Sequence, residues 1–272
     1  MLLTIITLCS VLFCVFVPEY AGVNLLWKAP LAFGGCFLTL ALLSVAVLWG
    51  LSRLVDPEKP RKTDSPFYRK LAAIYIEALV QVLLIRIHTE GLEKCPKEGR
   101  FFLVCNHLFA ADPGILLHVF PDKQLAFISK RENSSLFVVG RVMHAMLCQC
   151  LDRDNDRAAL KTILECIRLI REDLVSIAVF PEGGTNHDNH LHPFRPGVFK
   201  IPQKTNVPIV VCTLEGTREI FTNALRLKPS HVKVRLAEVI PPEEYAGMKT
   251  VELSDRVWEI MRRNLGAPYQ PD

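Results

Sequence analysis

A histidine and an aspartate five residues apart form the clearest catalytic pattern in this 272-residue sequence. His107 and Asp112 lie in the segment 106–113 (NHLFAADP), directly after the apolar run 101–105. An imidazole beside a carboxylate can act as a general base, because the carboxylate fixes the tautomer and stabilises the imidazolium that forms. The spacing therefore predicts a base at His107 with Asp112 as its partner. A structural His–Asp pair, or a simple helix cap at Asp112 before Pro113, is the alternative interpretation.

Two other segments place polar groups after predicted strands. The segment 180–185 (FPEGGT) has two glycines at a strand end, where backbone amides can approach an anion closely. Arg153 follows the apolar run 147–151. A tight surface turn and a surface ion pair with a neighbouring aspartate are the alternative interpretations of these two segments.

Short β-rich runs alternate with helical patterns along the part of the chain that carries these residues. The runs are 82–88, 101–105, 124–129, 147–151, 175–180, 208–214 and 232–240. Helical periodicity is clearest over 67–82, 155–172 and 249–264. Continuous apolar strands between helices predict an α/β fold with a mixed, largely parallel sheet flanked by helices. In such sheets functional groups gather in the loops beyond the strand ends, which is where the polar segments fall.

The N-terminal segment is far more apolar than the rest. Residues 1–52 contain 37 apolar residues and two charges, Glu19 and Lys28, whereas the remaining 220 residues have an ordinary globular composition. Residues 29–52 carry no charge, and at ~1.5 Å per residue they would cover about 36 Å, enough to cross a ~30 Å hydrocarbon core. Residues 1–17 are a second apolar run at the short limit for a span. A membrane anchor over 1–52 is predicted, as a helical hairpin of 1–20 and 30–52, with a cleaved signal peptide as the alternative for the first run.

A polar, basic linker over 53–66 is predicted to join the anchor to a domain over 67–272. Cations crowd this side of the apolar segment, whereas Lys28 is alone on the other. The positive-inside rule then predicts that the domain faces the cytoplasm. The crowded cations are Arg53, Lys59, Arg61, Lys62, Arg69 and Lys70. The helical pattern over 67–82 is either an interfacial helix on the bilayer or the first core helix of the domain.

The net charge and the cysteine content restrict the classes of binding partner and of metal site that are expected. The net charge of +4 is too weak and scattered for a nucleic-acid-binding protein, and it suits an anionic membrane or phosphorylated small molecules. The nine cysteines give an odd count without a disulfide framework, so reduced thiols are expected. Cys148 with Cys150, and the histidines of 187–192, could suggest a metal site. Neither has the spacing of a zinc site, and no metal is expected.

These segments, taken in order, resemble the glycerolipid acyltransferase family, the family of the 1-acylglycerol-3-phosphate acyltransferases. The resemblance rests on His107 and Asp112, then Arg153, then Phe-Pro-Glu-Gly at 180–183, then Val-Pro-Ile at 207–209. It runs from about residue 83 to residue 217. An apolar N-terminus on a membrane-bound enzyme is similar to the habit of this family.

The resemblance implies a role for each matching residue. His107 matches the base that takes the proton from the acceptor hydroxyl, and Asp112 matches its partner carboxylate. Arg153 matches the basic residue implied to hold the phosphate of the acceptor. Glu182 and Gly183 match a block that helps to bind the acceptor. Pro208 matches a block linked to binding of the acyl donor, which is acyl-CoA or acyl-carrier protein.

The third block departs from the family pattern. The family continues Glu-Gly-Thr-Arg, whereas this sequence reads EGGTN over 182–186, so that Gly184 is an extra glycine and Thr185 is followed by asparagine. The nearest basic replacements are His187, Arg195 and Lys200. We hypothesise that Arg153, together with Arg195 or Lys200, clamps the phosphate, since guanidinium groups match phosphate oxygens in geometry.

The resemblance implies an O-acyltransferase that forms phosphatidic acid from lysophosphatidic acid in phospholipid synthesis, with the lipid bilayer as partner and no cofactor beyond the acyl donor. The same transfer to glycerol-3-phosphate or to a lysophospholipid with a head group is the alternative. A non-catalytic membrane scaffold is a third possibility, disfavoured because His107 and Asp112 are both present. A thioester hydrolase is disfavoured because the sequence has no Gly-x-Ser-x-Gly nucleophile elbow.

Overall fold

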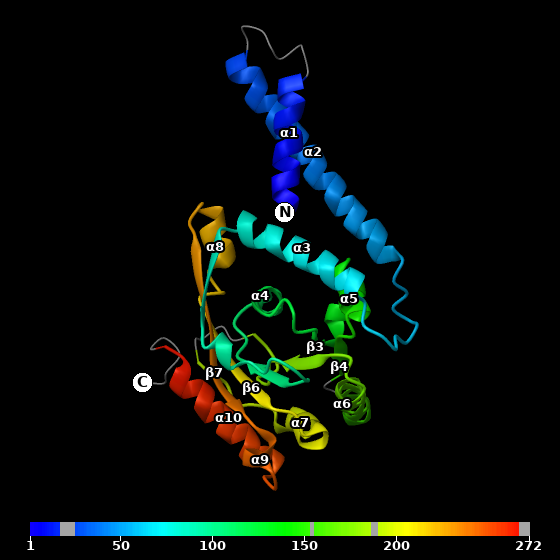
Figure 1. Cartoon of the computed structure of the whole chain (residues 1–272), viewed down its shortest axis with the longest axis vertical. Helices are drawn as coiled ribbons and strands as arrows, with labels where there is room; N and C mark the ends of the chain where they lie inside the picture. The colour runs from blue at the N-terminus through cyan, green and yellow to red at the C-terminus, as the bar shows by residue number, and fades with distance from the viewer. Residues whose placement is uncertain (17–24, 153–154, 186–189, 267–272) are drawn as a thin grey trace. The chain divides into compact units, whose positions relative to one another are not determined.

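The chain consists of two units, Met1–Lys59 and Pro60–Asp272 (Figure 1). The structure, a computed structural model, describes residues 1–16, 25–152, 155–185 and 190–266. The division between the units falls inside the segment 53–66 that was expected to be a linker.

The first unit is a pair of apolar helices, α1 (Leu2–Phe16) and α2 (Leu25–Arg53), which pack against each other. Within the described part of the chain, Lys28–Arg53 is the one helix that is long and apolar enough to cross a membrane, by length and composition. Polar side chains on the helices bond to their own backbone: Ser10 donates to the carbonyl of Ile6, and Thr39 to that of Gly35. Both predicted helices therefore form, although α1 ends at Phe16, and whether it spans stays a prediction.

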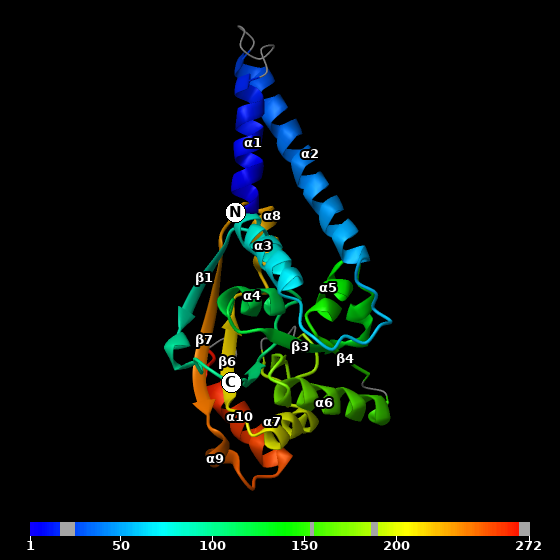
Figure 2. The same ribbon diagram turned by 45° about the vertical axis from the view of Figure 1, so that its right-hand side comes forward.

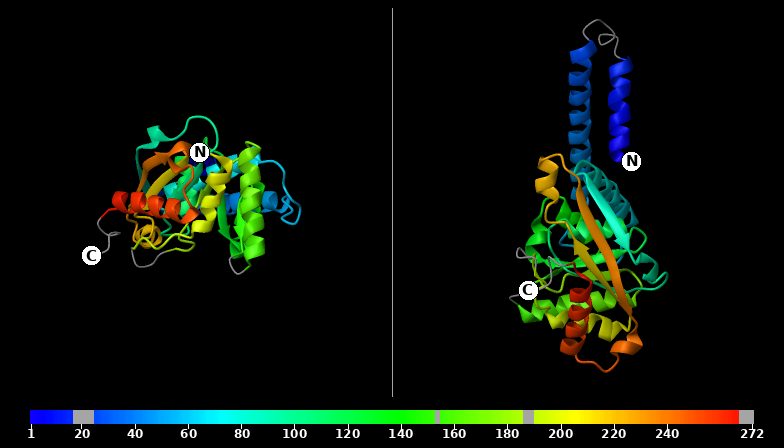
Figure 3. Two further views of the ribbon diagram at one scale, coloured as in Figure 1. Left: turned by 90° about the horizontal axis from the view of Figure 1, so that it is seen from below. Right: turned by 90° about the vertical axis from the view of Figure 1, so that its left-hand side faces the viewer.

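The second unit is built on a seven-stranded sheet in the order β1-β7-β6-β2-β5-β3-β4. Its neighbours run parallel except for β6 and β7, which are antiparallel. Every predicted strand is present, which confirms the mixed, largely parallel sheet. The strands are β1 (Ile85–Glu90), β2 (Phe102–Cys105), β3 (Leu125–Lys130), β4 (Gln149–Leu151), β5 (Ser176–Val179), β6 (Ile209–Glu215) and β7 (Ser230–Ile240). Figures 2 and 3 show β1 beside β7 at one margin of the sheet.

Helices cover both faces of the sheet. Strand β2 is buried on both sides, so that Phe102 and Val104 join one apolar cluster while Leu103 and Cys105 join the other. The first cluster is covered by α6 (Asp156–Arg171), α7 (Lys200–Thr205) and α10 (Thr250–Asn264), and the second by α3 (Pro66–Val82), α4 (Asp112–Val119) and α8 (Ile220–Leu225). Short elements complete the unit: η2 (Leu92–Lys94), η3 (Arg131–Ser135), α5 (Val139–Ala145), η4 (Pro196–Phe199) and α9 (Pro242–Tyr245).

Two of the three predicted helices of this unit begin at side-chain caps. Ser65 precedes Pro66 and its hydroxyl accepts a bond from Tyr68 N, while Asn155 accepts one from Ala158 N at 3.1 Å. Helix α3 packs its Ala78 into the core but leaves Phe67 and Val82 more than half exposed. The core interpretation of α3 therefore accounts for only part of its apolar surface.

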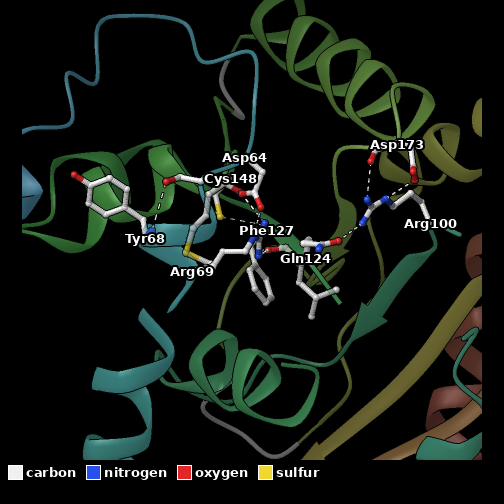
Figure 4. Close-up of polar contacts among 11 residues, drawn as sticks. Asp64, Tyr68, Arg69, Arg100, Gln124, Phe127, Cys148 and Asp173 are labelled. Carbon is white, nitrogen blue, oxygen red and sulfur yellow. Dashed lines mark hydrogen bonds and ion pairs between the residues drawn. The ribbon is translucent and has the colours of Figure 1, made fainter. Parts of the chain in front are cut away.

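Arg69 ties α3 to the sheet. Its guanidinium pairs with Asp64 and donates to the carbonyl oxygens of Leu125 (2.9 Å) and Met146 (3.3 Å) (Figure 4). The side chains of Arg69 and Asp64 are only 15% and 12% exposed. Arg69, which the sequence places among the cations after the apolar segment, therefore uses its charge inside the second unit.

Replacing Arg69 with methionine should lower the free energy of unfolding by about 2–4 kcal/mol, because Asp64 and two carbonyl groups lose their partner in a largely buried place. Chemical unfolding of the detergent-solubilised chain, followed by circular dichroism, measures the loss. The matched control is Arg168→Met on α6. Its ion pairs with Glu165 and Glu172 are about one-third to one-half exposed, so the loss should stay below about 1 kcal/mol. Equal losses of unfolding free energy in the two variants would contradict the role of Arg69 in joining α3 to the sheet.

Candidate active site

The predicted base and its partner meet where β2 ends. His107 follows the last residue of β2 by two positions, and Asp112 is the first residue of α4. The Nδ1 atom of His107 lies 2.8 Å from Oδ2 of Asp112. The same oxygen accepts hydrogen bonds from Leu108 N at 2.7 Å and Phe109 N at 2.8 Å. Asp112 is thus more than a helix cap, since its carboxylate bonds to the loop before the helix.

This geometry fixes the tautomer of the imidazole. An ionised carboxylate only accepts, so Nδ1 of His107 carries the proton and Nε2 is left with a lone pair. The Asp112 side chain is fully buried, whereas that of His107 is 18% exposed. The imidazole also stacks on Phe180, with ring centroids 4.2 Å apart and planes 20° apart. An aromatic face beside the ring favours the imidazolium that forms when Nε2 takes a proton.

Asn106 anchors the start of the catalytic loop. Its Oδ1 accepts from Leu214 N at 2.7 Å and its Nδ2 donates to Leu214 O at 2.9 Å, so the side chain continues the ladder between β2 and β6. The residue is 1% exposed. The sequence marks Asn106 only as a neighbour of His107. A polar residue that directly follows a fully buried strand is the signal that could have identified this role.

Glu182 binds the backbone of the catalytic loop at His107. One carboxylate oxygen accepts from the backbone N of His107 and the other from the backbone N of His192, both at 2.9 Å. Trp258 on α10 in turn donates from Nε1 to the carbonyl of His192 at 3.2 Å. Glu182 therefore links the catalytic loop to the segment after the glycines, and these contacts give it a positioning role. Its role in acceptor binding stays a prediction.

The two glycines bring the backbone close to a lysine that the sequence did not single out. Gly183 has a φ of +82°, a conformation that favours glycine. A Cβ atom added to Gly184 would lie 4.0 Å from Nζ of Lys130. Lys130 ends β3, which pairs in parallel with β5, so it is level with the start of the glycine turn. The signal that could have found it is a cation at the carboxyl end of a predicted parallel strand. Thr185, half-buried, follows the two glycines.

The remaining predicted phosphate ligands are not brought together by the described structure. Arg153 and His187 lie outside the described residues. The side chain of Arg195 is exposed, although its backbone N donates to Pro181 O at 2.9 Å and so places this residue beside the glycine turn. Lys200 is the exposed first residue of α7. The clamp of Arg153 with Arg195 or Lys200 therefore stays a prediction.

Pro208 lies at the other edge of the sheet from His107. Its carbonyl accepts from Phe102 N at 3.0 Å, at the amino end of β2, whereas His107 follows the carboxyl end. At ~3.3 Å per residue the two are roughly 20 Å apart along the strand. Pro208 shapes the entry of the chain into β6, and its assignment to the acyl donor stays a prediction.

The cysteine nearest the base is poorly suited to act as a nucleophile. Cys105 lies two residues before His107 and pairs in register with Cys212 on β6. Burial raises the pKa of the Cys105 thiol well above its usual value, and burial likewise raises the pKa of Cys212. Both therefore remain neutral thiols, which react poorly. An acyl-enzyme at Cys105 is disfavoured, and direct transfer to an acceptor hydroxyl is favoured.

The possible metal ligands are dispersed or occupied. In the described ranges, no three histidine, cysteine or acidic side chains gather as a metal site would require. The Sγ atom of Cys148 accepts from Phe127 N at 3.3 Å, and burial raises the pKa of this thiol to about 11 (Figure 4). A metal ligand must be a thiolate, so Cys148 is poorly suited. His187 lies outside the described residues, and the absence of a metal requirement stays a prediction.

Comparison with known proteins agrees with this geometry. A family model described as "Acyltransferase" matches residues 86–215, which includes the loop of His107 and the glycine turn. The 1-acyl-sn-glycerol-3-phosphate acyltransferase of Cocos nucifera is 29% identical over 77% of this chain and 67% of its own. That of Limnanthes alba is 27% identical over 85% and 81%, and the human alpha protein is 25% identical over 84% and 77%.

A solved structure shares the fold. The crystal structure of the 1-acyl-sn-glycerophosphate acyltransferase PlsC from Thermotoga maritima superposes with a TM-score of 0.61 at 22% identity, covering 96% of this chain and 95% of that one. At this identity the likeness concerns the fold alone. Residues 86–215 therefore form a domain that matches the acyltransferase family, and the chain is similar to 1-acyl-sn-glycerol-3-phosphate acyltransferases over 77–85% of its length.

Proposed function

We propose that this protein transfers an acyl chain from an acyl thioester to the free hydroxyl of lysophosphatidic acid and so forms phosphatidic acid. The observation that carries the proposal is the His107 imidazole, whose Nδ1 lies 2.8 Å from Oδ2 of Asp112, a contact that assigns the acceptor role to Nε2. The names of the relatives support this acceptor. Acyl-CoA and acyl-carrier protein both present the thioester that the reaction needs.

The reaction needs one base and no covalent enzyme intermediate. Nε2 of His107 takes the proton from the acceptor hydroxyl while the oxygen attacks the thioester carbonyl carbon. The carbon–sulfur bond then breaks, the thiolate leaves, and the proton passes from Nε2 to its sulfur. The buried carboxylate of Asp112 and the face of Phe180 stabilise the imidazolium between these steps. A thioester is already activated, so positioning and one base can supply a large rate factor.

The bilayer supplies the acceptor in this proposal. Lys28–Arg53 is long enough to act as an integral anchor, and cations follow it at Arg53, Lys59, Arg61 and Lys62. By the positive-inside rule these cations favour a catalytic unit on the cytoplasmic side. Such a location fits a bacterial inner membrane or the endoplasmic reticulum.

Replacement of His107 by alanine should abolish acyl transfer, and Asp112→Asn should lower kcat by about 10³–10⁴-fold, because an amide favours the wrong tautomer of the imidazole. The assay incubates detergent-solubilised chain with acyl-CoA and a panel of lysolipids and reads products by mass spectrometry beside thiol release. Circular dichroism checks that the variants fold. Equal thiol release by the unchanged chain and His107→Ala would overturn the catalytic assignment, and a product from another lysolipid alone would overturn the acceptor.

Glu182→Gln separates positioning from acceptor binding. A carboxamide has one accepting oxygen instead of two, so the backbone N of His107 or of His192 loses its partner. The expected result is a kcat lowered about 10–100-fold with the KM for the acceptor nearly unchanged. Steady-state kinetics at varied acceptor measure the two parameters. A raised KM with unchanged kcat would show instead that Glu182 binds the acceptor.

Lys130 is proposed as part of the phosphate site, because its ammonium faces the glycine turn. Lys130→Met should raise the KM for lysophosphatidic acid about 10–100-fold and leave the KM for monoacylglycerol, which lacks the phosphate, unchanged. Arg153→Ala, measured in the same way, tests the predicted clamp. Lys161→Met on α6 serves as the matched control and should change neither KM. If Lys130→Met kept the full preference for the phosphorylated acceptor, Lys130 would have no part in the site.

A further inference from the structure

The second unit exposes its large apolar side chains unevenly. Ten of the thirteen that are exposed among its described residues lie on three segments: α3 with the turn after it, residues 136–139 from the end of η3 to the first residue of α5, and α8 with the turn after it. Figures 1 and 2 show α8, α3 and α5 side by side at one end of this unit. Large exposed apolar patches mark interaction surfaces, so this end of the unit is a candidate for one.

Two of these segments flank the catalytic loop. Strands β2, β3 and β6 run in the same direction, so their carboxyl ends lie at one edge of the sheet. The loop of His107 follows β2, the connection that contains Leu136 and Phe137 follows β3, and α8 follows β6. The connection that contains Leu136 and Phe137 and the helix α8 therefore lie at the same edge of the sheet as His107, on either side of β2.

The segment 225–228 at the end of α8, called the α8 tip, combines apolar and basic side chains. Leu225 and Leu227 are 87% and 84% exposed, and the exposed cations Arg226 and Lys228 alternate with them. Leu227 has a φ of +54°, an unfavourable conformation for leucine, held by a bond from its N to Ala224 O at 3.0 Å.

Contacts lead from this tip to the catalytic pair. Phe221 of α8 packs edge-on against Phe109, with centroids 5.3 Å apart. The backbone N of Phe109 in turn donates to Oδ2 of Asp112. The contacting rings of Phe221 and Phe109 therefore connect α8 to Asp112, the residue that holds His107.

We infer that this edge of the second unit is itself a bilayer-docking surface, with Leu225 and Leu227 inserted among the acyl chains and Arg226 and Lys228 on anionic head groups. Alternating leucines and cations match the interfacial layer of a leaflet, where apolar and anionic groups are stacked within a few ångströms. The inference rests on the proposed function, because a lipid acceptor resident in the same leaflet would reach His107 past Phe221 and Phe109.

A site-specific photo-crosslinker tests the docking without using activity. The full chain is reconstituted in vesicles of equimolar phosphatidylcholine and phosphatidylglycerol with Leu227→p-benzoylphenylalanine, beside Leu164→p-benzoylphenylalanine on α6 as the control. Leu164 is 57% exposed but lies away from this edge. After illumination, phospholipid adducts are expected at position 227 and not at 164. Adducts to another polypeptide at 227, equal lipid adducts at both positions, or none at 227 would overturn the inference.

Kinetics then ask whether docking serves delivery of the acceptor. The double variant Leu225→Ser with Leu227→Ser should lose about tenfold in kcat/KM for long-chain lysophosphatidic acid in these vesicles and less than twofold for a short-chain analogue dissolved in water. The control pair Leu160→Ser with Leu164→Ser should change neither value. Equal losses on both acceptors would overturn delivery by docking. Absence of transfer to either acceptor by the unchanged chain would instead contradict the proposed function, while the crosslinks still judge the docking.

Discussion

The three N–H groups that converge on Oδ2 of Asp112 are the constraint on which the site depends. A fully buried carboxylate is costly unless its charge is met by hydrogen bonds. Here the imidazole of His107 and the backbone of Leu108 and Phe109 supply them together. One oxygen therefore fixes the path of the loop and the tautomer of the base at once, and neither can change without leaving a buried charge under-solvated.

The rest of the second unit brings other groups to this loop. Parallel strands end at a common edge, so residues distant in sequence meet there: the catalytic loop, the stacked ring of Phe180, and Lys130 beside the glycine turn. Glu182 then couples two of these segments through their backbones, and Trp258 extends the coupling to α10. Helix α10 thus supports the position of His107 through His192 and Glu182, without itself contacting the base.

Sequence reasoning reached the strands and the catalytic pair because both depend on local pattern. Continuous apolar runs indicate strands that are buried on both faces. His107 and Asp112 are close enough in sequence to meet across one turn. It missed Lys130, whose relation to Gly184 exists only once β3 and β5 pair. It gave no partner to Arg69, because Asp64, Leu125 and Met146 come together around this residue only through packing of α3.

The position of β1 bears on how this chain matures. β1 pairs with β7 at a distance of about 145 residues, Ile85 with Ser230, and within the described sheet β7 is its sole neighbour. During synthesis, then, the apolar segment before β1 leaves the ribosome long before β1 has a partner. The margin of the sheet at which β1 lies can therefore form only after β7 has been synthesised, late in the synthesis of the chain.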